Sequence, residues 1–118
     1  MKPRVYGIRN CDTMKKAFAW LEANGVAYDF HDYKKDGAPA DKLAAWAKQV
    51  GWEALPNSRG PTWRKIPEAE KQDLDEARAI ALLVRNPSAI RRPIVEGGSQ
   101  LIVGFDPERF ASLPRKLL

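Results

Sequence analysis

The pattern of hydrophobic and polar positions at the start of the chain predicts a strand, a helix and a second strand. Residues 4–8 predict a short strand, because Val5 and Tyr6 favour β structure. From about Thr13 the apolar residues recur at the spacing of one helix face; they are Met14, Ala17, Phe18 and Leu21. Asn24-Gly25 is a typical helix end, and residues 26–33 predict a second strand. A strand, a helix and a strand in about 30 residues favour a βαβ unit with parallel strands.

The middle of the chain is predicted to be mostly helical. One helix is indicated by apolar residues at helical spacing before Gly51, namely Leu43, Trp46, Ala47 and Val50. Residues 55–67 are rich in proline and predict an irregular connection. Residues 73–87 predict a further helix, because Asp73 and Glu76 have the spacing of a capping box and Pro87 ends the apolar pattern.

The last third of the chain returns to strands. Residues 93–105 are two apolar runs around Gly97-Gly98, which predicts a hairpin. Residues 106–118 predict a short helix with Asp106 as N-cap and Pro107 in its first turn. This element order indicates a thioredoxin-like α/β fold with a mixed four-stranded sheet. We expect one domain over residues 1–118, with an inserted helical subdomain at roughly 38–85.

Composition and charge narrow the setting. The 118 residues are 44% hydrophobic and 30% charged, as in an ordinary globular domain. No apolar run approaches the roughly 18–20 residues of a membrane span, and the N-terminus lacks a signal-peptide core. With a single cysteine, these features favour a reducing, cytoplasmic location. The net charge of +5 fits either a solvated basic surface or an anionic partner such as nucleic acid, a phosphate, an oxyanion or glutathione.

The single cysteine, Cys11, falls where the first strand passes into the first helix. There its sulfur can face the unpaired N–H groups and the positive dipole end of the helix, which favour a thiolate. Cysteines so placed have pKa values of roughly 3.5–7.5. Asp12 would raise the pKa, whereas Lys15, Lys16 and Arg9 would offset it. Position alone leaves open a buried cysteine that acts as a small hydrophobe.

A few other side chains are candidates for the site. Arg92 begins a strand expected at the sheet centre, where a guanidinium is costly unless it faces an anion or a cleft. Its neighbour Arg91 should point the opposite way, into solvent. We interpret His31 as a polar residue ending the second strand rather than as an acid–base group. Trp63, beside Arg64, is a candidate wall for a substrate.

Three separated segments resemble the ArsC family, which includes the arsenate reductases and the Spx-type regulators. The segments are "NCDTMKKAFAWL" around Cys11, "TWRK" around Arg64, and "DEARAIALLVRNPSAIRRPIV" over residues 75–95. Two further stretches, "HDYKK" and the "GF" at residues 104–105, are most similar to the YffB-like branch. The resemblance covers nearly the whole chain in the right order.

The resemblance implies roles for particular residues. Cys11 would be the catalytic nucleophile. Arg64 and Arg92 match two arginines that face this cysteine and bind an anion. Pro93 matches the proline that thioredoxin-like folds hold in cis beside the active cysteine. The expected substrate-binding residues are therefore Arg64, Arg92, Pro93, Asn10 and Thr13. Neither a metal nor a bound cofactor is expected.

The sequence also departs from the family's pattern. A third arginine of the arsenate reductases falls here at Phe105, so an oxyanion would lose a contact worth ~1.5–3 kcal/mol. The position three after Cys11 is Met14, so the Cys-x-x-Cys switch of Spx-type regulators cannot form.

From these features we expect a cytoplasmic thiol oxidoreductase that is glutathione-dependent. The Cys11 thiolate would form a mixed disulfide, and glutathione would be the co-substrate because the chain has no second cysteine. A small thiol or an oxyanion could also be the substrate, and glutaredoxin could be a partner. The alternatives are an arsenate reductase using glutathione and glutaredoxin, and a non-catalytic Spx-like regulator that binds RNA polymerase. Nucleic acid is not an expected partner, and a monomer is expected.

Overall fold

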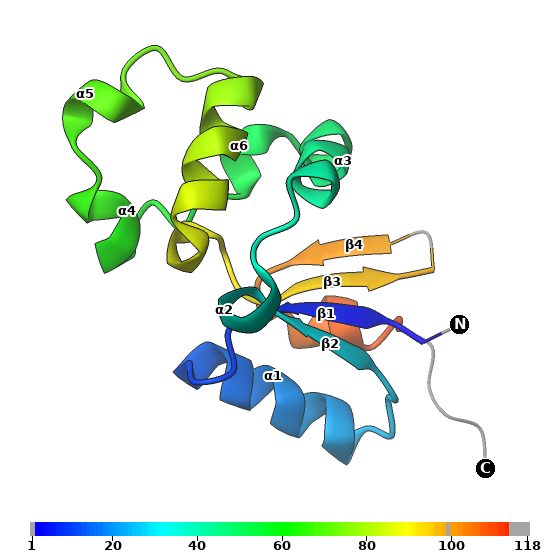
Figure 1. Cartoon of the computed structure of the whole chain (residues 1–118). Helices are drawn as coiled ribbons and strands as arrows, with labels where there is room; N and C mark the ends of the chain where they lie inside the picture. Colours follow the sequence, from blue (N-terminus) through cyan, green and yellow to red (C-terminus); the bar gives the residue numbers. More distant parts are fainter. Residues whose placement is uncertain (1, 99, 114–118) are drawn as a thin grey trace. The chain divides into compact units, whose positions relative to one another are not determined.

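The computed structural model describes residues 2–98 and 100–113. It consists of two compact units, one formed by the chain up to Tyr33 with the chain from Arg92 onward, the other by Lys34–Arg91. The second unit contains the segment 38–85, for which an insertion is predicted. In the first unit, which we call the sheet unit, the elements are β1 (Arg4–Gly7), α1 (Asp12–Ala23), β2 (Asp29–Asp32), β3 (Ile94–Gly97), β4 (Gln100–Val103) and α7 (Pro107–Phe110) (Figure 1).

The second unit, which we call the helical unit, contains no strand among its described residues. Its elements are α3 (Ala40–Val50), the 3₁₀ helix η1 (Trp52–Ala54), α4 (Pro61–Lys65), α5 (Glu68–Lys71), α6 (Glu76–Arg85) and the 3₁₀ helix η2 (Pro87–Ala89). A short helix, α2 (Tyr33–Asp36), spans the boundary between the units. Among the described residues, none of the helices combines the length and the hydropathy that a membrane crossing requires.

The sheet has four strands in the order β2-β1-β3-β4. The β1 strand pairs in parallel with β2 and antiparallel with β3, and β3 pairs antiparallel with β4. The parallel pair follows from the crossover through α1, and the antiparallel pair from the hairpin. The sheet is therefore mixed, which confirms the predicted thioredoxin-like fold class.

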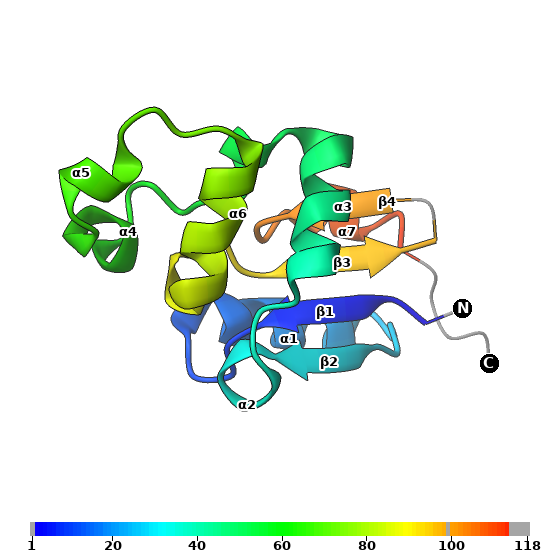
Figure 2. The same ribbon diagram turned by 45° about the horizontal axis from the view of Figure 1, so that its top comes forward.

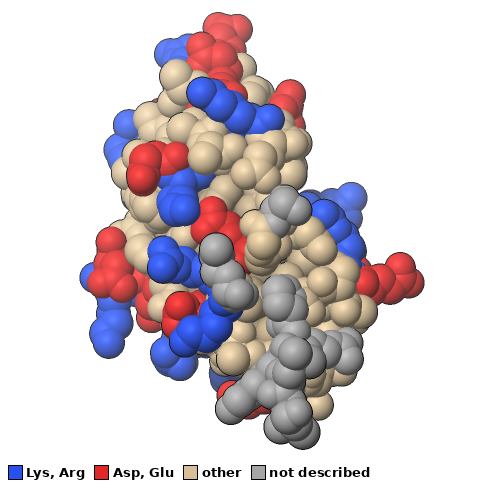
Figure 3. Space-filling model, turned by 90° about the vertical axis from the view of Figure 1, so that its right-hand side faces the viewer, with Lys and Arg blue, Asp and Glu red and all other residues tan. Residues whose placement is uncertain are grey.

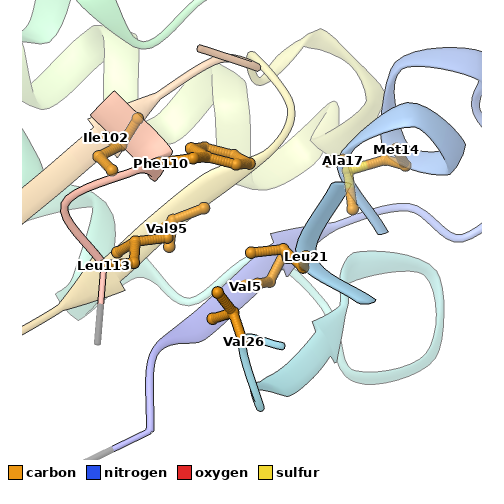
Figure 4. Packing of buried hydrophobic residues seen from close by; sticks show 9 residues of the cluster. All are labelled: Val5, Met14, Ala17, Leu21, Val26, Val95, Ile102, Phe110 and Leu113. Carbon is orange, nitrogen blue, oxygen red and sulfur yellow. The ribbon is translucent and has the colours of Figure 1, made fainter. Parts of the chain in front are cut away.

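One face of the sheet carries the core of this unit. The helices α1 and α7 lie on the same side of the strands (Figures 1 and 2). The buried residues that meet there come from three strands, from α1, from the connection between α1 and β2, and from the C-terminal segment (Figure 4); they are Val5, Met14, Ala17, Leu21, Val26, Val95, Ile102, Phe110 and Leu113. Packing is close at Gly7, where a Cβ atom would lie 2.5 Å from the Met14 sulfur. A side chain at Gly7 would displace Met14.

The opposite pleat of the same strands carries an aromatic cluster. Tyr6 and His31 are register partners on β1 and β2, and their ring centroids lie 5.3 Å apart. Tyr33 packs on both rings. The Tyr6 hydroxyl donates a hydrogen bond of 2.8 Å to Glu96. Burial, followed by this bond, raises the pKa of Tyr6 to about 12. Tyr6 therefore stays protonated at neutral pH, and His31 lies within β2 as part of an aromatic stack.

In the helical unit, α3 packs against α6. The residues that these helices bury are Leu43, Trp46, Ala47, Ala79, Leu82 and Leu83. Val50, the last residue of the apolar stripe predicted for α3, is exposed at the end of that helix. The predicted cap of α6 is wrong. Asp75, not Asp73, is the N-cap, and its carboxylate accepts a hydrogen bond of 2.9 Å from the Arg78 N–H. Asp73 has a positive φ of 52° and lies before the helix. The helix therefore begins two residues later than predicted.

Three other expectations change in detail. The second strand pairs only over Asp29–Asp32, because its partner β1 is itself only four residues long. Gly97 belongs to β3 and pairs with Gln100, so the hairpin turn begins after it. Residues 55–67, predicted to be irregular, contain the helix α4, and Pro61 is its first residue. A proline there is favourable because its fixed φ suits a helix start. Of the predicted C-terminal helix, Pro107–Phe110 is helical with Asp106 as its N-cap; positions 114–118 lie outside the described residues.

Charged side chains of both signs are interspersed over the face drawn in Figure 3. The net charge of +5 is thus not gathered into one basic patch on that face.

Candidate active site

The local backbone places Cys11 at the first turn of α1. Strand β1 ends at Gly7, the chain turns, and Cys11 becomes the N-cap of the helix with extended dihedrals of −143° and 134°. Its carbonyl accepts the first helical hydrogen bond, 2.9 Å from the Lys15 N–H. The thiol is free and half-buried, and it packs against the core between the sheet and α1. A partly exposed sulfur at a helix N-terminus is the arrangement typical of reactive cysteines.

Several contacts set the pKa of the Cys11 thiol. Burial raises it, but this effect is outweighed, and the pKa is lowered from its ordinary value. The lowering comes from the Met14 N–H, from hydrogen bonding by the Arg92 guanidinium, from the Thr13 N–H and from the Arg92 charge. The Cys11 side chain forms no capping hydrogen bond with these amides, so each amide acts on the sulfur as a nearby N–H dipole. These donors favour the thiolate, as expected at a helix start.

The second component of the site is the segment that enters β3. The antiparallel register pairs Tyr6 with Ile94, so the residues following Tyr6 and those preceding Ile94 lie side by side. Arg92 is thereby brought to Cys11. The Arg92–Pro93 peptide bond is cis, as the resemblance implies. Pro93 is buried, and its carbonyl accepts a hydrogen bond of 2.7 Å from the Gly104 N–H. This bond ties the segment to the end of β4.

The resemblance implies that an apolar side chain, Phe105, stands here at the position of a third arginine in the arsenate reductases. Phe105 follows β4 and is partly buried against the core of the sheet unit. Its ring meets the Phe110 ring edge-on, with the centroids 5.5 Å apart. Phe105 thus packs on the core of the sheet unit, and it carries no charge that could bind an oxyanion.

Not every expected residue is brought together with Cys11. The Asn10 side chain is exposed in the turn before α1, and the Thr13 side chain is exposed, so only its backbone N–H acts on the sulfur. The Arg9 guanidinium lies over the Phe30 ring, 4.9 Å from the centroid. The main causes of the lowered Cys11 pKa are the helix-start amides and Arg92 rather than Arg9 or Asp12. The N–H groups of Met14 and Thr13 act on the sulfur, as the position of Cys11 at a helix start predicts.

Arg64 belongs to the helical unit, where it is exposed on α4. Its neighbour Trp63 is fixed by Lys71, whose Nζ donates to the Trp63 carbonyl at 3.1 Å and lies 5.8 Å from the centre of the Trp63 ring. The same ammonium forms an ion pair of 3.4 Å with Glu68. Lys71 thus joins α5 to the helix that carries Arg64. Among residues 2–98 and 100–113, no cluster of three or more histidine, cysteine, aspartate or glutamate side chains could hold a metal ion.

A thioredoxin-like sheet with a cysteine at the first helix and a cis proline beside it defines a class of thiol-dependent proteins. The sequence pattern of the ArsC family matches residues 6–113, and the chain belongs to that family. It is 49% identical to a solved structure described as a YffB protein, covering 94% of this chain and 97% of that chain with a TM-score of 0.90.

Two more relatives represent different branches. An arsenate reductase (ArsC) related protein from Brucella melitensis is 46% identical, with 95% of this chain and 93% of that chain covered and a TM-score of 0.75. The global transcriptional regulator Spx of Streptococcus mutans is 28% identical over 109 residues, which is 90% of this chain and 79% of that protein. The chain is thus similar both to arsenate-reductase-related proteins and to a regulator.

Replacing Arg92 with methionine is expected to raise the pKa of Cys11, because it removes a hydrogen bond and a positive charge that favour the thiolate. Below both pKa values, each unit of increase lowers the thiolate fraction roughly tenfold. The pH dependence of alkylation by iodoacetamide, followed by mass spectrometry, measures the change directly because the chain has one cysteine. Arg9→Met is the matched control, since Arg9 lies over Phe30. An unchanged profile in Arg92→Met would remove Arg92 from the site.

Proposed function

We propose that this chain is a glutathione-dependent thiol oxidoreductase with Cys11 as its nucleophile. The proposal is carried by one observation, the half-buried cysteine whose pKa is lowered by a helix start and by Arg92. Membership in a family with arsenate-reductase-related members supports thiol-based reductase chemistry. We also propose that residues 1–118 form one domain with a helical insertion at roughly 38–85.

The reaction consists of two thiol–disulfide exchanges. The Cys11 thiolate attacks the glutathione sulfur of a glutathionylated substrate, R–S–S–G, and forms a mixed disulfide with glutathione. The S–S bond of the substrate breaks, and R–S⁻ leaves and takes up a proton from water. A second glutathione, as thiolate, then attacks the mixed disulfide. Cys11 leaves as its thiolate, and glutathione disulfide is released. The net reaction, R–S–S–G + GSH → R–SH + GSSG, consumes one free glutathione, whose thiolate supplies the electron pair that leaves with R–S⁻.

The proposed binding residues follow from the charges of glutathione. Its two carboxylates suit guanidinium groups, and we assign them to Arg92 and Arg64. The buried cis Pro93 would lie along the peptide of the substrate. Asn10, through its side chain, and Thr13, through its backbone N–H, would contribute polar contacts at the helix start. No bound cofactor is assigned. We place the protein in the cytoplasm as a monomer, with glutaredoxin as a candidate partner and without a nucleic-acid ligand.

Capture of the intermediate tests this proposal. On incubation with glutathione disulfide, the chain is expected to gain the mass of one glutathionyl group at Cys11. Added glutathione should then remove it. The Arg9→Met variant is expected to behave like the wild type, whereas Arg92→Met should react more slowly at neutral pH because its cysteine is less ionised. A Cys11 that is alkylated by iodoacetamide but never gains glutathione would contradict the glutathione assignment.

Arsenate reduction is a second candidate, favoured by the similarity to the Brucella melitensis protein. An oxyanion at Cys11 would meet Arg92 but would find Phe105 where a third cation is expected. Turnover of arsenate with glutathione and glutaredoxin would decide between the two reductases. If a Phe105→Arg variant acquired an arsenate activity that the wild type lacks, the missing arginine would be the reason.

A regulatory role is the third candidate, favoured by the similarity to Spx. With Met14 three residues after Cys11, a Cys-x-x-Cys disulfide is impossible, so binding of RNA polymerase would not be controlled by that switch. Specific retention of purified RNA polymerase by the immobilised chain, together with absent glutathionylation, would favour this function over the reductase.

A further inference from the structure

The helical unit contains a pocket of about 400 Å³ whose lining is mostly polar. The lining residues are Glu53, Pro56, Asn57, Ser58, Arg59 and Arg91. The volume lies within the roughly 300–1,000 Å³ of small-molecule sites. All six residues belong to Lys34–Arg91, so the pocket is contained within one unit.

The backbone around this pocket is held by hydrogen bonds. Two segments that are distant in sequence run antiparallel through a bridge between Pro56 and Ile90. The Arg91 N–H donates to the Leu55 carbonyl at 2.8 Å, and the Asn57 N–H donates to the Ala89 carbonyl at 2.7 Å. Leu55, Ala89 and Ile90 are buried beneath this frame. The pocket therefore has a fixed floor, and the backbone at the base of its exposed charged side chains is held in place.

A turn completes the wall. The Gly60 N–H donates to the Asn57 carbonyl at 2.9 Å, which closes a four-residue turn. A Cβ atom at Gly60 would lie 2.6 Å from the Asn57 side-chain nitrogen, so glycine leaves room for that amide. Within the part of the chain that the structure describes, the backbone N–H groups of Ser58 and Arg59 have no hydrogen-bond acceptor. These two donors are available to a ligand.

The charges of the pocket define what it can bind. The side chains of Arg59, Arg91 and Glu53 form no ion pair or hydrogen bond with any described residue. Guanidinium groups bind carboxylates by paired hydrogen bonds. The Glu53 carboxylate would repel a simple dianion such as phosphate, but it would attract an ammonium group. Two guanidiniums and one carboxylate complement a molecule with two carboxylates and one ammonium.

We infer that this pocket binds a small dicarboxylic amino acid, with its carboxylates at Arg59 and Arg91 and its ammonium at Glu53. Arg91 thus has a binding role in the helical unit, while the adjacent Arg92 acts at Cys11 in the sheet unit. The inference does not depend on the proposed reductase activity. Glutathione carries the same set of charges, so the test uses a probe without a thiol.

The test is titration of the full-length chain with L-glutamate, read by amide chemical shifts and by calorimetry. We expect saturable binding, with shift changes centred on residues 53–59 and 89–91, and weaker binding of glutarate, which lacks the ammonium. Arg59→Gln and Arg91→Gln should each weaken glutamate binding about tenfold or more, as loss of a charge-assisted contact does. Glu53→Gln should remove the preference for glutamate over glutarate.

The control is Arg78→Gln, because Arg78 is an exposed arginine of the same unit that does not line the pocket. It should bind glutamate like the wild type. Equal weak binding of glutamate, glutarate and phosphate that disappears with added salt would identify a nonspecific basic surface and overturn the inference. The absence of shifts near residues 53–59 would also overturn it. Glutathionylation of Cys11 is measured separately, so failure of the reductase proposal leaves this result intact.

Discussion

Turnover of a glutathionylated thiol is expected to fall to the uncatalysed rate when Cys11 is replaced by serine. A serine hydroxyl is not ionised at neutral pH and cannot form a disulfide. The chain has no other cysteine that could take its place. The measurement is reduction of a small glutathionylated substrate in the presence of glutathione, with glutathione disulfide recycled by an added reductase whose cofactor absorbance is recorded. The loss should appear in kcat, because the nucleophile takes part in every turnover.

Two further measurements sharpen this result. Since the second thiol comes from solution, the rate of the second step should rise linearly with glutathione concentration until binding saturates. Thr13→Ala should retain most of the activity, because Thr13 acts on the sulfur through its backbone N–H while its side chain is exposed. Circular dichroism of Cys11→Ser confirms that the fold is intact. Turnover that persists in this variant would exclude Cys11 as the nucleophile and, with it, the proposed mechanism.

Replacing Phe110 with alanine is expected to lower the free energy of unfolding by about 3–5 kcal/mol. Phe110 has an exposed fraction of 0%. Its ring meets the Trp20 and Phe105 rings edge-on, with centroid separations of 5.6 and 5.5 Å. Alanine would lose these contacts and leave a cavity between α1, α7 and the sheet. Urea unfolding followed by tryptophan fluorescence measures the loss, and Trp20 reports on the cavity itself.

Phe105→Ala provides the matched control, since it removes the same side chain from a partly exposed position in the same cluster. Its loss of stability should be less than half of that in Phe110→Ala, because folding buries less apolar area at residue 105 than at residue 110. Equal losses in both variants would mean that α7 is not packed as described. A loss below about 1 kcal/mol in Phe110→Ala would mean the same, since that is far below the usual cost of removing a buried ring.

The order of the elements could be predicted from the sequence because local signals agree with the final packing. The stripe of Met14, Ala17 and Leu21 is the buried face of α1. Asp106 is the N-cap of α7 and Pro107 is its first residue, which are the positions that these residue types favour. The start of α6 could not be predicted, because Asp73 and Asp75 both suit an N-cap, and only the backbone decides which carboxylate reaches the Arg78 N–H.

The sequence could predict those parts of the candidate site that depend on which amino acid stands at a position. The resemblance marks Cys11, Arg92 and Pro93 as site residues. In the structure they lie together because the β1–β3 register brings their segments side by side. The pKa of Cys11 is lowered by the helix-start N–H groups, which the position of the cysteine predicts, and by Arg92, which is distant in the sequence. Arg9, which is near Cys11 in the sequence, lies over the Phe30 ring instead. The role of Arg64 stays a prediction.

The way in which the helical unit joins the sheet has a consequence for modularity. The chain leaves the sheet after β2, which runs parallel to β1, and returns to it at β3, which runs antiparallel. Departure and return therefore occur at the same end of the sheet, with only β1 between them. Strands two places apart are separated by about 10 Å, a gap that a loop of a few residues spans. The four strands, α1 and α7 thus form a closed scaffold into which a segment of almost any size could be spliced or exchanged, and Arg92 would keep its place next to Cys11.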